Sequence, residues 1–334
     1  MPLIRVSHLV KEYKTYDRRQ GISGAFLDLL FREYKTLRAV DDISFEIEKG
    51  EIVGYIGANG AGKSTTIKIL CGILFPTSGE VVVDGRVPFA DREAHVRNIG
   101  AVFGQRSQLW WDLAAGESLH LLARIYGLSD AEYAQRMDEF DKVLELKEFL
   151  KTPARKLSLG QKMRCELAAS LIHNPNIVFL DEPTIGLDVS VKQSIRDFVH
   201  RINKERGVTV ILTTHDLRDI EELCSRILMI DKGKLIFNGS LETLRSKAQD
   251  SAQLTFSLSH ALEKNWNPDG LPQQGIVWKS NGASLTAILG HNAPPRADVI
   301  RVVLDRYGQE VQDISIAEPQ IEHIVQQIYK AGSV

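Results

Sequence analysis

The stretch Gly57–Ser64 reads GANGAGKS, and it lies between the predicted strand Glu51–Ile56 and a segment, Ser64–Gly72, with the apolar spacing of a helix. A strand before the motif and a helix after it are the context that the phosphate-binding loop pattern requires. Its glycines let successive backbone N–H groups point inward at phosphate oxygens, and the helix N-terminus favours an anion. The stretch therefore predicts a phosphate cradle on an α/β scaffold.

Two side chains at the end of this loop have predicted chemical roles. Lys63 reaches the β- and γ-phosphates of a nucleotide, and Ser64 offers its hydroxyl to Mg²⁺. The alternative interpretation is a glycine-rich turn with an incidental Lys-Ser pair. The residues predicted to contact the nucleotide here are Gly57, Asn59, Gly60, Ala61, Gly62, Lys63, Ser64 and Thr65.

Two acids follow a second apolar strand. Ile177–Leu180 is a short apolar run, and Asp181 and Glu182 come directly after it. Buried acids are unfavourable unless a cation is paired with them, and Mg²⁺ beside the phosphate loop would be such a cation. We expect Asp181 to hold the metal, largely through water, and Glu182 to polarise an attacking water. The alternative is a strand that merely ends in solvated acids.

The remaining pattern predicts strands that alternate with helices. Val208–Leu212 is another apolar strand, and it ends in a polar segment that includes His215. Such alternation indicates an α/β fold with a largely parallel sheet, whose ligands bind at the carboxyl ends of the strands. Leu3–Val10 and Asp42–Ile47 alternate as two further strands, and residues 16–38 between them are predicted to be a partly helical insertion.

Four motifs, in their order along the chain, resemble those of ABC-type ATPases. They are Gly57–Ser64, Leu157–Gln161, Asp181-Glu182 and Thr214–Asp216, and the resemblance covers Leu3 to Gly239. It implies a cassette with a mostly parallel core, an antiparallel β subdomain and a helical subdomain at about residues 106–170. The domain boundaries expected are 1–240 for the ATPase and 241–334 for an accessory domain.

The resemblance also implies roles for residues outside the phosphate loop. Ser158, Gly160 and Gln161 match the signature motif, which caps the γ-phosphate held by the opposite subunit; Leu159 departs from the glycine common at that place. The alternative for this segment is a plain helix cap. Asp188 matches the loop that crosses the dimer interface.

Three further positions are assigned in the same way. Gln105 matches the glutamine that senses Mg²⁺ and water, and His215 matches the switch histidine that contacts the γ-phosphate. Tyr13 is similar to the aromatic residue that stacks on adenine; the alternative is a structural strand tyrosine. The predicted catalytic set is thus Lys63, Gln105, Glu182 and His215, and the predicted metal ligands are Ser64, Gln105 and Asp181.

The same resemblance implies a head-to-tail dimer with ATP sandwiched between two subunits. This chain carries every motif, so a homodimer with two competent sites is expected. The chain has no apolar run of the ~18 residues that a spanning helix needs. Its formal net charge of −2 gives no basic footprint for nucleic acid. Its N-terminus does not read as a signal peptide, and its three dispersed cysteines fit a reducing compartment.

The partner implied is an integral membrane permease on separate chains, of the bacterial exporter type, with this chain peripheral on the cytoplasmic face. Trp110 and Trp111 follow Gln105 and suggest a docking loop; the alternative is that both pack into the helical subdomain. Three other functions stay open: an importer ATPase, a mechanical or regulatory switch on a non-transporting partner, and a binding-only scaffold.

The region after Gly239 is predicted to be a small α+β accessory domain. Gln253–Leu258, Ser284–Leu289 and Val311–Ile316 are its predicted strands, and Ala297–Tyr307 and Ile321–Tyr329 its predicted helices. Leu241–Ala248 is expected to be a charged helix or linker. This C-terminal region resembles the accessory domains found on exporter ATPases of the same family.

Overall fold

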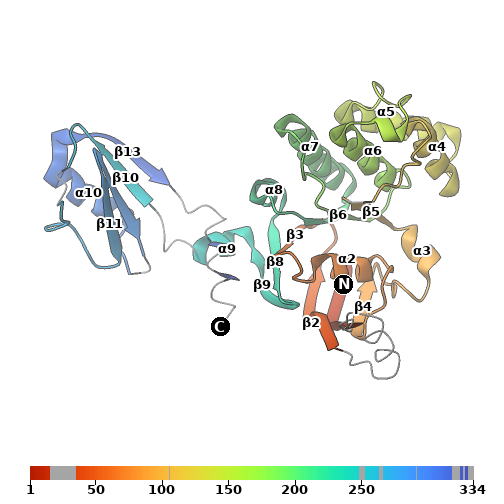
Figure 1. Ribbon diagram of the computed structural model, residues 1–334, viewed down its shortest axis with the longest axis horizontal. Coiled ribbons are helices and arrows are strands. Elements are labelled where there is room, and N and C mark those ends of the chain that lie inside the picture. Colours follow the sequence, from red (N-terminus) through yellow and green to blue (C-terminus); the bar gives the residue numbers. More distant parts are fainter. Residues whose placement is uncertain are drawn as a thin grey trace, which may run out of the picture. The chain divides into compact units, whose positions relative to one another are not determined.

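The chain folds into two compact units, Met1–Gly239 and Ser240–Val334 (Figure 1). The computed structural model describes residues 1–15, 35–104, 106–247, 253–262, 266–290, 292–317, 324–325 and 328–329. In those ranges, no helix combines the length and the apolar character that crossing a bilayer requires. All the predicted nucleotide motifs lie in the larger unit.

The larger unit alternates strands and helices along the chain. Its elements are β1 (Ile4–Thr15), β2 (Lys35–Ile47), β3 (Ile52–Gly57), α2 (Lys63–Leu70), β4 (Ser78–Val83), α3 (Arg92–Val96), β5 (Ile99–Phe103), α4 (Ala115–Ile125), α5 (Asp130–Leu144), α6 (Leu159–Leu171), β6 (Ile177–Asp181), α7 (Val189–Arg206), β7 (Thr209–Thr213), α8 (Leu217–Leu223), β8 (Arg226–Asp231) and β9 (Lys234–Ser240).

A six-stranded sheet in the order β5-β6-β7-β3-β8-β9 forms the core of this unit. The first five of these strands pair in parallel. Every residue of β3 is buried, as expected for a parallel strand that is covered on both faces. Because the carboxyl ends of parallel strands share one edge, the loops after β3, β6 and β7 meet there. That edge holds the candidate site.

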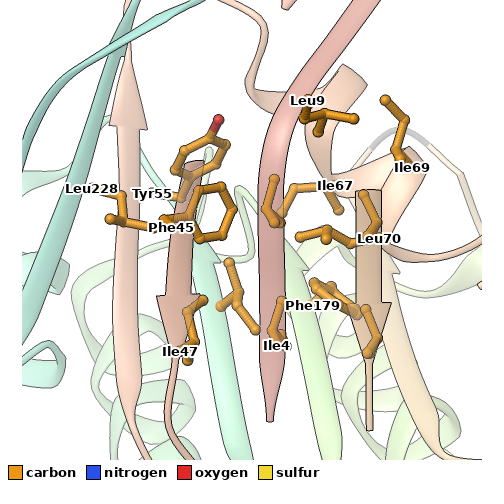
Figure 2. Close-up of a cluster of buried hydrophobic side chains, with 14 of the residues drawn as sticks. Ile4, Leu9, Phe45, Ile47, Tyr55, Ile67, Ile69, Leu70, Phe179 and Leu228 are labelled. Atoms are coloured by element: carbon orange, nitrogen blue, oxygen red, sulfur yellow. The ribbon is translucent and has the colours of Figure 1, made fainter. Parts of the chain in front are cut away.

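A second sheet, in the order β2-β1-β4, is antiparallel and packs on α2 and the parallel sheet. Figure 2 shows the shared core, in which Phe45 of β2 lies beside Tyr55 of β3 with ring centroids 6.2 Å apart. Ile67 and Leu70 of α2 belong to the same cluster. This packing anchors the helix that begins in the phosphate loop.

Helices α4, α5 and α6 group together on one side of the larger unit, away from β2 and β4 (Figure 1). A short 3₁₀ turn, Ala154–Lys156, leads into α6. The predicted α/β fold, with a parallel core, an antiparallel subdomain and a helical subdomain, is confirmed.

The smaller unit is an antiparallel sheet with one long described helix. Its elements are α9 (Leu241–Lys247), β10 (Gln253–Leu258), β11 (Ile276–Asn281), β12 (Ser284–Leu289), α10 (Arg296–Tyr307), a 3₁₀ turn (Gly308–Glu310) and β13 (Val311–Ala317), with strand order β11-β12-β10-β13. Alternate residues of β10 and β12 pack against Val299 and Val303 of α10. Most of the predicted helix Ile321–Tyr329 lies outside the described residues.

Several boundaries differ from those that the sequence predicts. Strand β2 begins at Lys35, so the last four residues of the predicted insertion 16–38 belong to a strand. Residues 35–38 pair with the end of β1. Because these four residues are all exposed, their sequence lacks the apolar alternation that marks a strand. Residues 16–34 lie outside the described residues. Strands β8, β9 and β11 were not predicted, since no motif flanks these short runs.

Candidate functional site

The loop between β3 and α2 needs its glycines for two different reasons. A Cβ on Gly57 would lie 2.5 Å from the carbonyl oxygen of Ile230, so only glycine fits the space. Gly62 combines a φ of +113° with a Cβ position 2.3 Å from the carbonyl oxygen of Ala39. Gly60 is in open space but has a φ of +79°, which glycine adopts without cost. The loop is therefore curled and open toward solvent at Gly60.

Lys63 is folded back inside this loop. Its Nζ donates to the carbonyl oxygens of Gly57 at 2.6 Å and Ala58 at 3.1 Å, and the side chain is buried. Burial lowers the pKa of the Lys63 ammonium, and the nearby carboxylates of Glu182 and Asp181 oppose that shift. The ammonium is thus held at the floor of the curl, where a phosphate would meet it.

Asp181 joins the ends of three elements. Its Oδ2 accepts from the Ser64 hydroxyl of α2 at 3.2 Å, and its Oδ1 accepts from the Thr213 hydroxyl of β7 at 2.5 Å. A serine hydroxyl beside a carboxylate is an oxygen donor set that suits Mg²⁺, which usually completes its shell with water and substrate phosphates. Among the described residues, His, Cys, Asp and Glu nowhere form a group of three or more that could hold a metal. Asp181 and Ser64 therefore suit a metal ion whose remaining ligands come from a bound phosphate and water.

Glu182 lies one residue further on, in a strained backbone conformation. Its φ is +57°, and its N–H donates to the carbonyl oxygen of Thr213 at 2.9 Å. Non-glycine residues in this left-handed region are uncommon and gather at functional sites. Its Oε1 lies 2.7 Å from Nε2 of His215. The side chains of Glu182 and His215, from the ends of β6 and β7, therefore meet in the fold.

Two clefts border Glu182. One, of about 330 Å³, is lined by residues that include Ser64, Asp181 and Glu182. The other, of about 270 Å³, is lined by residues that include Glu182 and His215. Glu182 therefore belongs to the lining of both clefts.

The segment Ser158–Gln161 forms the start of α6, whose first residue is Leu159. The Ser158 hydroxyl accepts from the Gln161 N–H at 3.2 Å, and the Gln161 side chain accepts from the Ser158 N–H at 3.0 Å. This reciprocal pair is a capping box. Leu159, at the place of the expected glycine, is half exposed. The segment is a helix cap with an exposed face.

Asp188 caps α7 next to this segment. Its carboxylate accepts from the Val191 N–H at 2.9 Å and the Ser190 hydroxyl at 2.7 Å, and these bonds lower its pKa. Val191 lies against Gly160, because a Cβ there would meet its side chain at 3.1 Å. The structure thus contains a second group of predicted site residues, made of Ser158, Gly160, Gln161 and Asp188. This group is distinct from the first, which consists of Lys63, Asp181, Glu182 and His215.

The sequence matches a known protein family. Residues 40–185 match the family described as ABC transporter. The chain is 33% identical over 210 residues to the ABC transporter ATP-binding protein NatA of Bacillus subtilis (strain 168), a match that covers 63% of this chain and 85% of NatA.

The chain belongs to the ABC transporter ATP-binding proteins. It is also 36% identical over 226 residues to a probable multidrug ABC transporter ATP-binding protein, YbhF of Escherichia coli (strain K12), covering 67% of this chain and 38% of YbhF. A dimeric post-hydrolysis structure of the cassette MJ0796 bound to ADP and Pi matches with a TM-score of 0.60 and 28% identity, over 71% of this chain and 98% of that one. The chain is therefore an ABC ATPase, as predicted.

For two of the predicted site residues of this ABC cassette, Gln105 and Tyr13, the structure gives less information. Gln105 lies outside the described residues. Tyr13 is half-buried in β1 opposite Leu37, and the Lys11 ammonium lies 5.3 Å from its ring centroid. Strand β2 passes Gly62 at Ala39, two residues beyond Leu37. Tyr13 is thus on the sheet that flanks the phosphate loop.

The tryptophan pair of the cassette is solvent-accessible. Trp110 is 38% exposed and Trp111 is 66% exposed, while the preceding Leu109 is buried. Asp112 and Arg155 form an ion pair at 2.5 Å beside them. The alternative in which both tryptophans pack into the helical subdomain therefore does not hold for Trp111, while Trp110 is partly covered.

Sequence reasoning missed Glu166, an acid buried in α6. Its carboxylate accepts from the Ser107 hydroxyl and from the Gln108 N–H at 3.0 Å, so the helix that Ser158 caps is tied to the loop that precedes Trp110. Burial raises the pKa of the Glu166 carboxyl, although hydrogen bonds from Ser107 and Gln108 oppose that shift. The available signal was an acid next to the apolar run Leu167–Ala169.

This pKa shift gives a test by pH. A carboxyl whose pKa is raised on folding stabilises the fold fully below its ordinary value of 4.5, and this contribution is lost as the pH rises through the folded pKa. Glutamine does not titrate. We therefore expect the free energy of unfolding of Glu166→Gln, relative to the wild type, to improve as the pH rises from about 5 to about 8. Urea unfolding at several pH values measures it; a difference that is constant with pH would contradict the expectation.

Proposed function

We propose that this chain is the ATP-hydrolysing subunit of an exporter, and that two copies close on ATP and drive a permease on separate chains. The observation that carries the catalytic part is the 2.7 Å contact between Glu182 and His215, one residue from the Asp181–Ser64 pair and beside the buried Lys63. In this proposal Glu182 is the base, Asp181 the carboxylate that holds the metal and Lys63 the cation that binds phosphate, all at one edge of the sheet.

In this proposal each residue near the phosphate acts on one part of the reaction. The amides of Gly57–Thr65 and the Lys63 ammonium hold the β- and γ-phosphates, which requires Lys63 to leave the carbonyl oxygens of Gly57 and Ala58. Ser64, Asp181 and Gln105 hold Mg²⁺, which when bound neutralises charge on the phosphate oxygens. Glu182 accepts the proton of the attacking water, and His215 contacts the γ-phosphate and keeps the Glu182 carboxylate in place.

The second group of residues serves the site of the opposite copy. The capped start of α6, with Ser158, Gly160 and Gln161, presents its N-terminus to the γ-phosphate there. Leu159, Ile185 and Val189 are 50%, 53% and 80% exposed. Gly186 lies against Leu159, so this apolar face is continuous with the signature segment. An exposed apolar face beside two motifs supports an interface between two copies, with Asp188 at its edge and Tyr13 stacked on adenine.

The permease part of the proposal rests on the exposed tryptophan loop. Trp110 and Trp111 lie three and four residues beyond Ser107, which Glu166 of α6 ties to that helix. A membrane subunit that docks there would be linked to the helix that closes on ATP. The chain would then lie peripherally on the cytoplasmic face of the membrane. The likeness to a probable multidrug relative supports export of drug-like cargo.

A capture experiment tests the docking. The tagged chain is taken from mild-detergent extracts of its own cells, and a multi-spanning membrane protein is expected in stoichiometric amount. Trp110→Ala with Trp111→Ala should reduce this amount about tenfold or more, because aromatic anchors carry much of an interface's energy. The matched control is Val277→Ala, an exposed apolar residue of the smaller unit. Recovery of only a soluble partner would favour the mechanical switch instead.

A further inference from the structure

Asp219 of α8 is a fully buried acid that none of the roles above uses. Three donors meet its carboxylate. Oδ1 accepts from Arg196 Nε of α7 at 2.7 Å, while Oδ2 accepts from the hydroxyls of Thr184 and Thr214, the latter at 3.0 Å. A buried carboxylate is unfavourable unless it is paired and hydrogen-bonded, and these donors satisfy both conditions. Asp219 is therefore fixed in one position.

The two threonines come from the two loops that carry the catalytic pair. Thr184 follows Glu182 by two residues, and Thr214 directly precedes His215. Both are almost completely buried, at 2% and 4% exposed. Because their hydroxyls share one oxygen atom, Asp219 fixes the separation between the loop after β6 and the loop after β7. The Glu182–His215 contact spans the same gap.

Two basic residues of helix α7 contact Asp219 and the His215 loop. Arg196 is 6% exposed and also pairs with Glu222 at 3.1 Å. One helical turn earlier, Lys192 pairs with Asp216 at 2.6 Å, directly after His215. The helix that begins at the Asp188 cap therefore holds both sides of the His215 loop.

We infer that Asp219, with Thr184, Thr214 and Arg196, is a positioning clamp that sets the catalytic distance between Glu182 and His215. Thr184 and Thr214 border the cleft that Glu182 and His215 line, and the clamp acts by positioning that pair. It acts on the chemical step by holding two loops in register, and it leaves the phosphate-binding loop alone. This inference rests on the proposed roles of Glu182 and His215.

The test removes one hydroxyl without changing the size of the side chain. Thr184→Val should lower kcat for ATP about 10- to 100-fold, because a small misplacement of a catalytic group has effects of this size. KM for ATP should change less than about threefold, since Lys63 and the glycines are untouched. Thr184→Ser, which restores the hydroxyl, should recover most of the lost kcat. A matched control is Thr255→Val, which removes a hydroxyl bonded to Thr286 in the smaller unit.

A second variant and a parallel measurement distinguish failure of the clamp from failure of the proposed role of Glu182. Thr214→Val removes the other hydroxyl and should also lower kcat; both variants are assayed below their own melting transitions. If Glu182→Gln abolishes turnover while both valine variants keep kcat within about twofold of the wild type, the clamp is overturned and the proposed function stands. If Glu182→Gln itself keeps turnover, the proposed role of Glu182 fails first.

Discussion

Replacing Glu182 with glutamine is expected to lower kcat for ATP hydrolysis about 10²- to 10⁴-fold and to trap an ATP-bound dimer. Glutamine keeps the size of the side chain but cannot accept the proton of the attacking water. The contacts of Lys63, Ser64 and Asp181 are unchanged, so ATP should still bind. Phosphate release measures the first effect, and light scattering with and without ATP measures the second.

The control for this variant is Glu148→Gln, which changes an exposed acid of the helical subdomain. It should hydrolyse ATP like the wild type and show no trapped dimer. Wild-type turnover in Glu182→Gln would remove Glu182 from its proposed role. Loss of turnover without ATP-dependent dimers would keep that role but contradict the closing step.

Replacing Ser158 with arginine is expected to abolish the ATP-dependent dimer and to lower turnover at least 100-fold, a size typical of losing an electrostatic contact to the transition state. Ser158 caps α6 on the face that we assign to the opposite copy. Arginine places a long charged side chain where two surfaces must close. ATP binding to the phosphate loop of the same chain should remain, and equilibrium binding of a labelled nucleotide measures it.

A second variant separates this steric effect from loss of the cap. Both Ser158→Arg and Ser158→Ala remove the side-chain acceptor for the Gln161 N–H, which costs about 1 kcal/mol of helix stability. Only arginine adds bulk and charge. In the Glu182→Gln background, Ser158→Ala should therefore keep a weakened dimer that Ser158→Arg lacks. Equal dimerisation of the two variants would argue against the interface.

The sequence predicts the nucleotide edge of this fold well for a local reason. A glycine-rich loop between a strand and a helix, and polar residues after apolar strands, are patterns within about ten residues of chain. The parallel sheet then brings the ends of β3, β6 and β7 together, so Asp181 meets Ser64 and Glu182 meets His215. The roles of these residues in catalysis stay predictions.

Long-range contacts were not predictable from such patterns. Asp219, Arg196, Thr184 and Thr214 meet only because α7 and α8 pack on the loops after β6 and β7, and each residue alone is unremarkable in sequence. Glu166 was missed for the same reason, since its partners Ser107 and Gln108 are 59 and 58 residues away. The start of β2 was missed because its first residues are exposed and polar.

The central claim is that each ATP is hydrolysed between the phosphate loop of one copy and the signature segment of another. Mixing equal amounts of two variants of low turnover, Ser158→Ala and Lys63→Ala, tests it most directly, because neither variant adds bulk that would keep the two copies apart. A mixed dimer combines the intact Lys63 of one chain with the intact Ser158 of the other, so one of its two sites is complete. With random pairing, the mixture should recover up to about a quarter of wild-type turnover. Turnover that stays at the sum of the two separate variants would contradict the shared site.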